Sequence, residues 1–320
     1  MKENKLKVMI LEGGMSFERY TSLESSVSVQ NALKNYDKYE IDVVDLKNMD
    51  FCDKFIKNRP DVVFNLLQGK YGEDGRIQGM LDILKIPYTH SGVLASAIGM
   101  NKWVSKMLCE KIGLNTAKGV LLNKENYDGH LVDNIKKPFI VKPNDEGQSL
   151  GVTLVNNDET FNFDGYNWDG GKELIVEEFI KGREFSVTVL NNLVLEPVEI
   201  KSKNIFFDTE AKDNEEKTSY SFNTLSNEKN MELKNIAMKI HKIIGCKDIS
   251  RSDFILNEVD NLFYYLETNT HPGLTYPHSL TPMSLENSGY SLLDLCVYLI
   301  ENASYEGYKD KKHYELVKIA

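Results

Sequence analysis

The sequence carries SRSDF at residues 250–254 and, a short turn later, LETNTHPGLT at residues 266–275. Both motifs lie within otherwise apolar segments that predict neighbouring β-strands, over 248–256 and 262–269. Strands joined by a turn this short pair antiparallel. The polar residues inside these apolar strands are therefore candidates for a functional site.

Side chains two residues apart on a strand point to the same face, so Arg251 and Asp253 face one way, as do Glu267 and Asn269. Pairing of the strands can bring Asp253, Glu267 and Asn269 together. Three hard oxygen ligands suit Mg²⁺, and Arg251 beside them suits developing negative charge. The alternative is the solvated polar face of an antiparallel sheet.

A second candidate site is the glycine-containing loop of IVKPNDEGQSLGV, residues 140–152, which lies between two strand-like segments. Backbone N–H groups of such a loop can cradle phosphate, and Lys142 supplies positive charge from the preceding strand. The loop is not a Walker A motif, because no Gly-Lys-Ser/Thr ends it. Taken alone, the pattern is also that of an ordinary hairpin.

A third candidate is EGGMSFE at residues 12–18, which follows the apolar strand predicted over 6–11. A dinucleotide-binding turn needs G-x-G-x-x-G, and the third glycine is missing here. Two interpretations remain open: a plain strand-to-helix turn, or a helix N-terminus that holds an anion, with Glu18 meeting a cationic amine.

The first hundred residues alternate strands and helices, which predicts a parallel sheet with right-handed crossovers. The expected strands cover 6–11, 39–46 and 61–67, and the expected helices 21–35, 53–58 and 77–84; Thr21 and Glu24 have capping-box spacing. This α/β region predicts a first domain over 1–101.

From a helix expected over 102–112 onward, the pattern changes to strands joined by turns, which is α+β character. These strands are expected over 138–142, 152–155, 174–179, 185–190 and 194–200, and later helices over 231–244 and 291–301. A second domain over 102–189 and a third over 190–320 follow. The polar, aperiodic segment 201–227 predicts a functional, mobile loop.

Composition excludes several classes of protein. The 320 residues include 38 Lys and Arg against 48 Asp and Glu, a net charge of −10, which argues against nucleic-acid or anionic-membrane partners. No apolar run approaches the roughly 20 residues of a membrane span, and the apolar stretch near the start is too short for a signal peptide. Four cysteines without a CxxC pair favour a cytoplasmic protein with buried thiols.

Together these motifs resemble the ATP-grasp superfamily and, within it, the D-alanine–D-alanine ligases. The similarity runs over roughly residues 8–300, and its motifs occur in the family's order. They are GGMSFER (13–19), GKYGEDGRIQGMLDILKIPYTHSGVLASAIGMNK (69–102), IVKPNDEGQSLGV (140–152), VEEFIKGRE (176–184), FFDTEAK (206–212), SRSDF (250–254) and LETNTHPGLT (266–275). The resemblance implies an ATP-grasp fold preceded by an N-terminal parallel-sheet α/β domain.

The resemblance also implies site residues. Those matching the family's ATP-binding positions are Lys102, Lys142, Ser149, Glu177, Phe179, Ile180, Glu184, Phe206 and Lys212. Those matching its metal ligands, for two Mg²⁺ ions replaceable by Mn²⁺, are Asp253, Glu267 and Asn269. Those matching catalytic groups are Arg251, Lys212, Glu18 and Gly273, and those on the amino-acid side are Glu18, Gln68, Gln148, Asp213, Arg251, Gly273, Ser279 and Leu280.

The chain departs from the family pattern on the amino-acid side. Gln68 stands where the family has His, Gln148 where it has Ser, and Asp213 where it has Tyr. The segment between Gly273 and Ser279 is one residue longer than in the family pattern. The ATP and Mg²⁺ positions are intact, so these changes bear on the second substrate rather than on the ligase chemistry.

The expected function is ATP-dependent formation of D-alanyl-D-alanine through an acyl phosphate, for peptidoglycan precursor synthesis, by a cytoplasmic homodimer. Small-molecule amino acids are the expected substrates. Two alternatives remain: a ligase of the same chemistry with another amino acid or a hydroxy acid as second substrate, and a non-catalytic nucleotide-binding module. A nicotinamide oxidoreductase is disfavoured by the missing third glycine.

Overall fold

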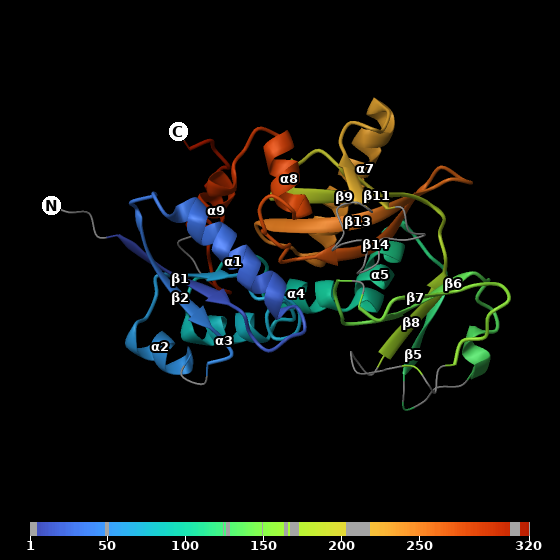
Figure 1. Ribbon diagram of the computed structural model, residues 1–320, viewed down its shortest axis with the longest axis horizontal. Helices are drawn as coiled ribbons and strands as arrows, with labels where there is room; N and C mark the ends of the chain where they lie inside the picture. Colours follow the sequence, from blue (N-terminus) through green and yellow to red (C-terminus); the bar gives the residue numbers. More distant parts are fainter. Residues whose placement is uncertain are drawn as a thin grey trace.

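The computed structural model describes residues 5–48, 51–123, 125, 129–148, 150–162, 166, 173–202, 218–307 and 314–319. Within these residues the strands form three sheets (Figure 1). None of the helices described is long and apolar enough to cross a membrane.

The first sheet is parallel, as the alternating pattern predicted. Its strands lie in the order β2-β1-β3. Its elements, with the helices of this region, are β1 (Leu6–Glu12), α1 (Arg19–Leu33), β2 (Tyr39–Asp45), α2 (Phe51–Lys57), β3 (Val62–Asn65) and α3 (Arg76–Leu84). Val8 and Ile10 of β1 belong to one core cluster, while Met9 and Leu11 belong to another. Both faces of β1 are therefore covered, which is why this strand is continuously apolar.

A seven-stranded sheet forms the centre of the molecule, in the order β12-β11-β9-β13-β14-β4 with β10 paired to β9 (Figure 1). Its strands are β4 (Asn115–Thr116), β9 (Gly182–Leu190), β10 (Leu193–Val194), β11 (Val198–Ser202), β12 (Thr218–Ser221), β13 (Ile249–Asn257) and β14 (Phe263–Asn269). The associated helices are α4 (Val93–Met100), α5 (Lys102–Lys111), α7 (Asn227–Ile244) and α8 (Leu280–Asn287), whereas α9 (Leu292–Glu301) packs on α1 and β3 of the N-terminal region.

A separate antiparallel sheet, β5-β8-β6-β7, lies beside the central one (Figure 1). Its elements are β5 (Gly119–Asn123), the 3-10 helix η1 (Gly129–Val132), β6 (Phe139–Pro143), β7 (Thr153–Val155) and β8 (Glu173–Glu178). The loop between β6 and β7 is the glycine-containing loop recognised in the sequence.

The pairing of β13 with β14 is antiparallel, as predicted. Asp253 lies directly opposite Glu267 and Arg251 opposite Asn269, and the register shifts immediately after Asp253. All four side chains therefore lie on one stretch of the central sheet.

Three local predictions were wrong. Thr21 does not cap a helix: α1 begins at Arg19 with Glu18 at the N-cap position, because the chain turns earlier than the capping-box spacing suggested. The strand expected over 194–200 is split into β10 and β11. The segment 201–227 is not wholly a loop, since β12 pairs with β11 and α7 begins at Asn227.

Two glycines provide a matched test of backbone packing. A Cβ at Gly182 would lie 2.1 Å from the carbonyl oxygen of Leu256 on the adjacent strand, which cannot move without breaking the ladder. A Cβ at Gly79, inside α3, would meet nothing closer than 3.8 Å.

We expect Gly182→Ala to lower the free energy of unfolding by about 1–3 kcal/mol through this overlap. Gly79→Ala should raise it by up to about 1 kcal/mol, because alanine is the better helix former. Chemical denaturation of both variants checks the pair; equal effects would contradict the close approach of β9 and β13.

Candidate functional site

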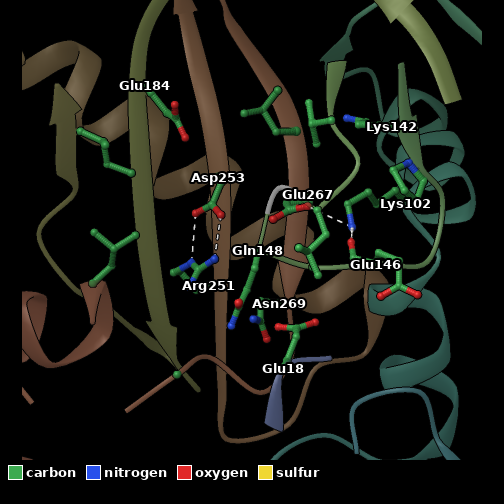
Figure 2. A pocket seen from close by; sticks show the side chains of 18 of the residues that line it. Glu18, Lys102, Lys142, Glu146, Gln148, Glu184, Arg251, Asp253, Glu267 and Asn269 are labelled. Atoms are coloured by element: carbon green, nitrogen blue, oxygen red, sulfur yellow. Dashed lines mark hydrogen bonds and ion pairs between the residues drawn. The ribbon is translucent and has the colours of Figure 1, made fainter. Parts of the chain in front are cut away.

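A cavity of about 410 Å³ opens between the four-stranded and seven-stranded sheets and extends to the N-terminal region (Figure 2). It brings together sixteen of the residues expected from the sequence. These are Glu18, Gln68, Lys102, Lys142, Gln148, Glu177, Phe179, Ile180, Glu184, Arg251, Asp253, Glu267, Asn269, Gly273, Ser279 and Leu280. Ser149, Phe206, Lys212 and Asp213 lie outside the described residues.

Two cation–carboxylate pairs occupy the middle of the cavity (Figure 2). The Arg251 guanidinium donates to both Asp253 oxygens, at 3.1 Å and 2.9 Å, and Lys102 Nζ lies 3.3 Å from Glu267 Oε2. Although burial opposes the charge on Arg251, Asp253 more than compensates and raises its pKa. Asp253 also accepts a 2.6 Å bond from Ser186 Oγ of β9, which fixes the carboxylate.

The oxygen atoms of Asp253, Glu267 and Asn269 fit a hard divalent cation in kind. Two are carboxylates and one is an amide, and all three side chains line the cavity. In this structure positive side chains compensate the two carboxylates, as a cation would. No group of three or more His, Cys, Asp or Glu residues suited to a metal occurs among the described residues, so any such site needs Asn269 or ligand oxygens as well.

A buried carboxylate between two lysines lies at the other side of the cavity. Glu177 of β8 is 2.5 Å from Lys142 Nζ and 2.9 Å from Lys106 Nζ. Burial alone would raise the pKa of Glu177, but the two ammonium groups outweigh burial and lower it. Lys106, which also donates to the Ala117 carbonyl, was missed in the sequence. Its spacing of four from Lys102 on a predicted helix, which puts both on one face, could have revealed it.

Apolar side chains from both sheets form a slot next to Glu177. Ile140 of β6 faces this space from one sheet, and Ile200, Ile255 and Leu266 come from the central sheet. Such a slot suits a flat apolar ring, while Glu177 and the backbone of the segment after β8 supply polar atoms at its edge.

Buried acids mark the N-terminal end of the cavity. Glu18 begins α1, and the neighbouring Arg19 anchors this turn through an ion pair with Asp45 at 2.5 Å. Glu73 lines the same cavity; one of its oxygens accepts from Gly69 N at 2.9 Å, and the other has no hydrogen-bond partner among the described residues. Burial, and then the charge of Glu18, raise the pKa of Glu73 well above its ordinary value.

The segment after β14 joins this end to the central sheet. Gln68 Nε2 donates to the His271 carbonyl at 3.0 Å, and Leu274 N donates to Ser25 Oγ of α1 at 3.0 Å. Ser279 and Leu280 stand at the N-terminus of α8, facing the cavity. A helix N-terminus favours an anion, and a carboxylate fits this position.

Comparison with known proteins decides the family. A family model described as D-ala D-ala ligase C-terminus matches residues 108–301, and one described as D-ala D-ala ligase N-terminus matches residues 51–91. A D-alanine–D-alanine ligase from Rickettsia akari is 40% identical over 304 residues, 94% of this chain and 93% of the relative. This chain belongs to the D-alanine–D-alanine ligase family.

Solved structures of the family superpose over nearly the whole chain. The D-alanine–D-alanine ligase of Bacillus anthracis has a TM-score of 0.80 at 30% identity and covers 92% of this chain and 96% of its own. The VanG D-Ala:D-Ser ligase of Enterococcus faecalis has a TM-score of 0.78 at 26% identity, with coverage of 93% and 99%. The ATP-grasp fold with an N-terminal parallel-sheet domain, expected from the motifs, is confirmed.

Glu73 predicts a pH-dependent stability difference. Because folding raises its pKa, the carboxyl is neutral in the fold at low pH, and its ionisation destabilises the fold as the pH rises above 4.5. We therefore expect Glu73→Gln to melt higher than the parent at pH 8, with the difference shrinking towards pH 4.5. Thermal melts across this range check it, with the exposed Glu40→Gln as control. A difference that does not change with pH contradicts the assignment.

Proposed function

We propose that this chain is an ATP-dependent ligase that joins two molecules of D-alanine, supplying D-alanyl-D-alanine for peptidoglycan precursors. The observation that carries the proposal is a single cavity whose lining includes Lys102, Lys142 and Glu177 as well as Glu18, Arg251 and the N-terminus of α8 (Figure 2). Full-length relatives at about 40% identity that are D-alanine–D-alanine ligases support it.

ATP fits the half between the two sheets. A D-alanine–D-alanine ligase of Bacillus anthracis complexed with ATP has a TM-score of 0.78 to this chain, at 29% identity, covering 93% of this chain and 97% of its own. The apolar slot takes the adenine, with Glu177, Phe179 and Ile180 at its polar edge. Glu184 takes the ribose, and Lys102 and Lys142 neutralise the phosphates.

Asp253, Glu267 and Asn269 are the residues that would hold Mg²⁺. When bound, the metal neutralises phosphate charge and orients the transferring group. In this structure Arg251 and Lys102 compensate the charge of the same carboxylates.

The reaction proceeds in two balanced steps. A carboxylate oxygen of the first D-alanine attacks the γ-phosphorus of ATP, giving an acyl phosphate and ADP. The deprotonated amine of the second D-alanine then attacks the acyl carbon, and the tetrahedral intermediate loses an amine proton to phosphate or solvent and expels phosphate to leave the dipeptide.

The chain's own groups position these steps. Glu18 holds the ammonium of the first D-alanine, and the N-terminus of α8 at Ser279 and Leu280 holds the carboxylate of the second. Arg251 and the backbone at Gly273 face the acyl carbon, where negative charge develops. Gln68 fixes the Gly273 segment through the His271 carbonyl.

Four further assignments rest on the family resemblance alone. Ser149 and Lys212 are proposed at the phosphates, with Lys212 also at the developing charge, Phe206 over the adenine and Asp213 on the amino-acid side. A cytoplasmic homodimer remains proposed, as do domains over 1–101, 102–189 and 190–320. The pairing of β9 with β13 favours moving the second boundary to about Gly182.

A coupled assay tests the function. With ATP, Mg²⁺ and D-alanine, the protein should release ADP and form D-alanyl-D-alanine. A clear preference for D-serine or D-lactate as second substrate would favour the alternative ligase, which the similarity to a D-Ala:D-Ser ligase keeps in view. Nucleotide binding without ADP release, with any amino acid, would leave only a binding module.

Glu267→Gln should reduce turnover at least about 100-fold at low Mg²⁺, because an amide is a weaker ligand for a hard cation. The matched control is Glu232→Gln, whose carboxylate pairs with Lys229 on α7 outside the cavity. Initial rates against Mg²⁺ concentration check this; near-normal activity at low Mg²⁺ means that the metal site is wrongly placed.

A further inference from the structure

The loop between β6 and β7 contacts the N-terminal region at several points. At its tip, Gln148 Nε2 donates a short hydrogen bond to Thr21 Oγ1 of α1, a partner 127 residues away. Both side chains line the cavity. A hydrogen bond therefore connects the candidate phosphate loop directly to α1, the helix whose N-cap is Glu18.

Lys70 makes a second connection between the same two parts. Its Nζ lies 2.7 Å from Glu146 Oε1 and 3.4 Å from Asp145 Oδ2, both in the loop. Burial works against its charge, but the two loop carboxylates prevail and raise the pKa of Lys70. Lys70 therefore carries a positive charge that pairs with the loop.

Between these two connections the loop backbone lies on the Glu18 carboxylate. A Cβ added to Gly147 would be 2.5 Å from Glu18 Oε1, and one added to Gly69 would be 2.9 Å from it. The carboxylate therefore lies against two glycine positions, where any side chain would collide with it.

Gln148 adopts an unfavourable backbone conformation. Its φ is +53°, in the left-handed region that residues other than Gly, Asn and Asp rarely adopt. Surrounding contacts must hold it there, and the bond to Thr21 is one of them. A serine, which the family has at this position, has a side chain too short to span the same gap.

We propose that Gln148–Thr21 and Lys70–Asp145/Glu146 form a latch that holds the β6–β7 loop over Glu18 and so couples ATP use to occupancy of the first amino-acid position. These are positioning residues: they act by keeping Gly147 over the carboxylate and by excluding water from the acyl phosphate. The inference rests on the proposed function.

The central test compares Thr21→Val, which removes the acceptor at nearly constant shape, with Thr21→Ser, which keeps it. For Thr21→Val and Gln148→Ala we expect the KM for D-alanine at the first position to rise about 3–10-fold, the effect of losing one partly buried hydrogen bond. ADP released per dipeptide should rise above the parent's ratio, while Thr21→Ser stays within about twofold of the parent. The double variant that combines Thr21→Val with Gln148→Ala should have a KM and an ADP-to-dipeptide ratio no higher than those of the more impaired single variant.

Lys70→Met should give the same loss of coupling through the second connection. Two controls make local contacts of the same types away from the loop. They are Gln30→Ala, whose amide bonds Ser26 within α1, and Lys57→Met, whose ammonium pairs with Asp53 within α2. Both should keep the parent's ADP-to-dipeptide ratio.

A parent-like ratio and KM in Thr21→Val and Gln148→Ala would overturn the latch while leaving the ligase assignment intact. If the parent itself makes no dipeptide, the proposed function fails first. A thermal-melt cycle over Thr21→Val and Gln148→Ala then tests the latch without turnover: non-additive changes in Tm support the contact, and additive changes overturn it.

Discussion

The antiparallel pairing of β13 with β14 places two carboxylates, Asp253 and Glu267, directly opposite each other on one face of the central sheet. Like charges in this position disfavour pairing unless cations lie beside them. Arg251 comes from the same strand, two residues before Asp253, and Lys102 from the start of α5. The pairing of these strands and the position of α5 therefore both depend on compensation of these two negative charges. The chemistry of the cavity depends on the same compensation.

The same principle recurs at Glu177, where a buried carboxylate lies between Lys142 and Lys106. Breaking such a pair leaves a charge uncompensated in a low-dielectric environment. At both places a ligand can replace the protein's own partners. Phosphate groups can pair with the lysines, and a metal ion can bind the carboxylates. In this structure the buried charges at both places are paired within the protein.

The N-terminal end follows a different principle. Burial, and then the charge of Glu18, raise the pKa of Glu73 well above its ordinary value. Under the proposed function, the ammonium group of an amino acid would bring positive charge to these two acids. The β6–β7 loop meets the same region, because Gly147 lies against the Glu18 carboxylate and Gln148 donates to Thr21.

The spacing of residues along each strand determined much of this site in advance. Because side chains alternate with a period of two, the sequence alone predicted that Arg251 and Asp253, and likewise Glu267 and Asn269, share a face, and continuous apolar runs predicted the buried parallel strands. Only the tertiary structure decided contacts between distant segments. The bond from Gln148 to Thr21 and the proximity of Gly147 to Glu18 depend on how the sheets and helices pack, and no local periodicity encodes them.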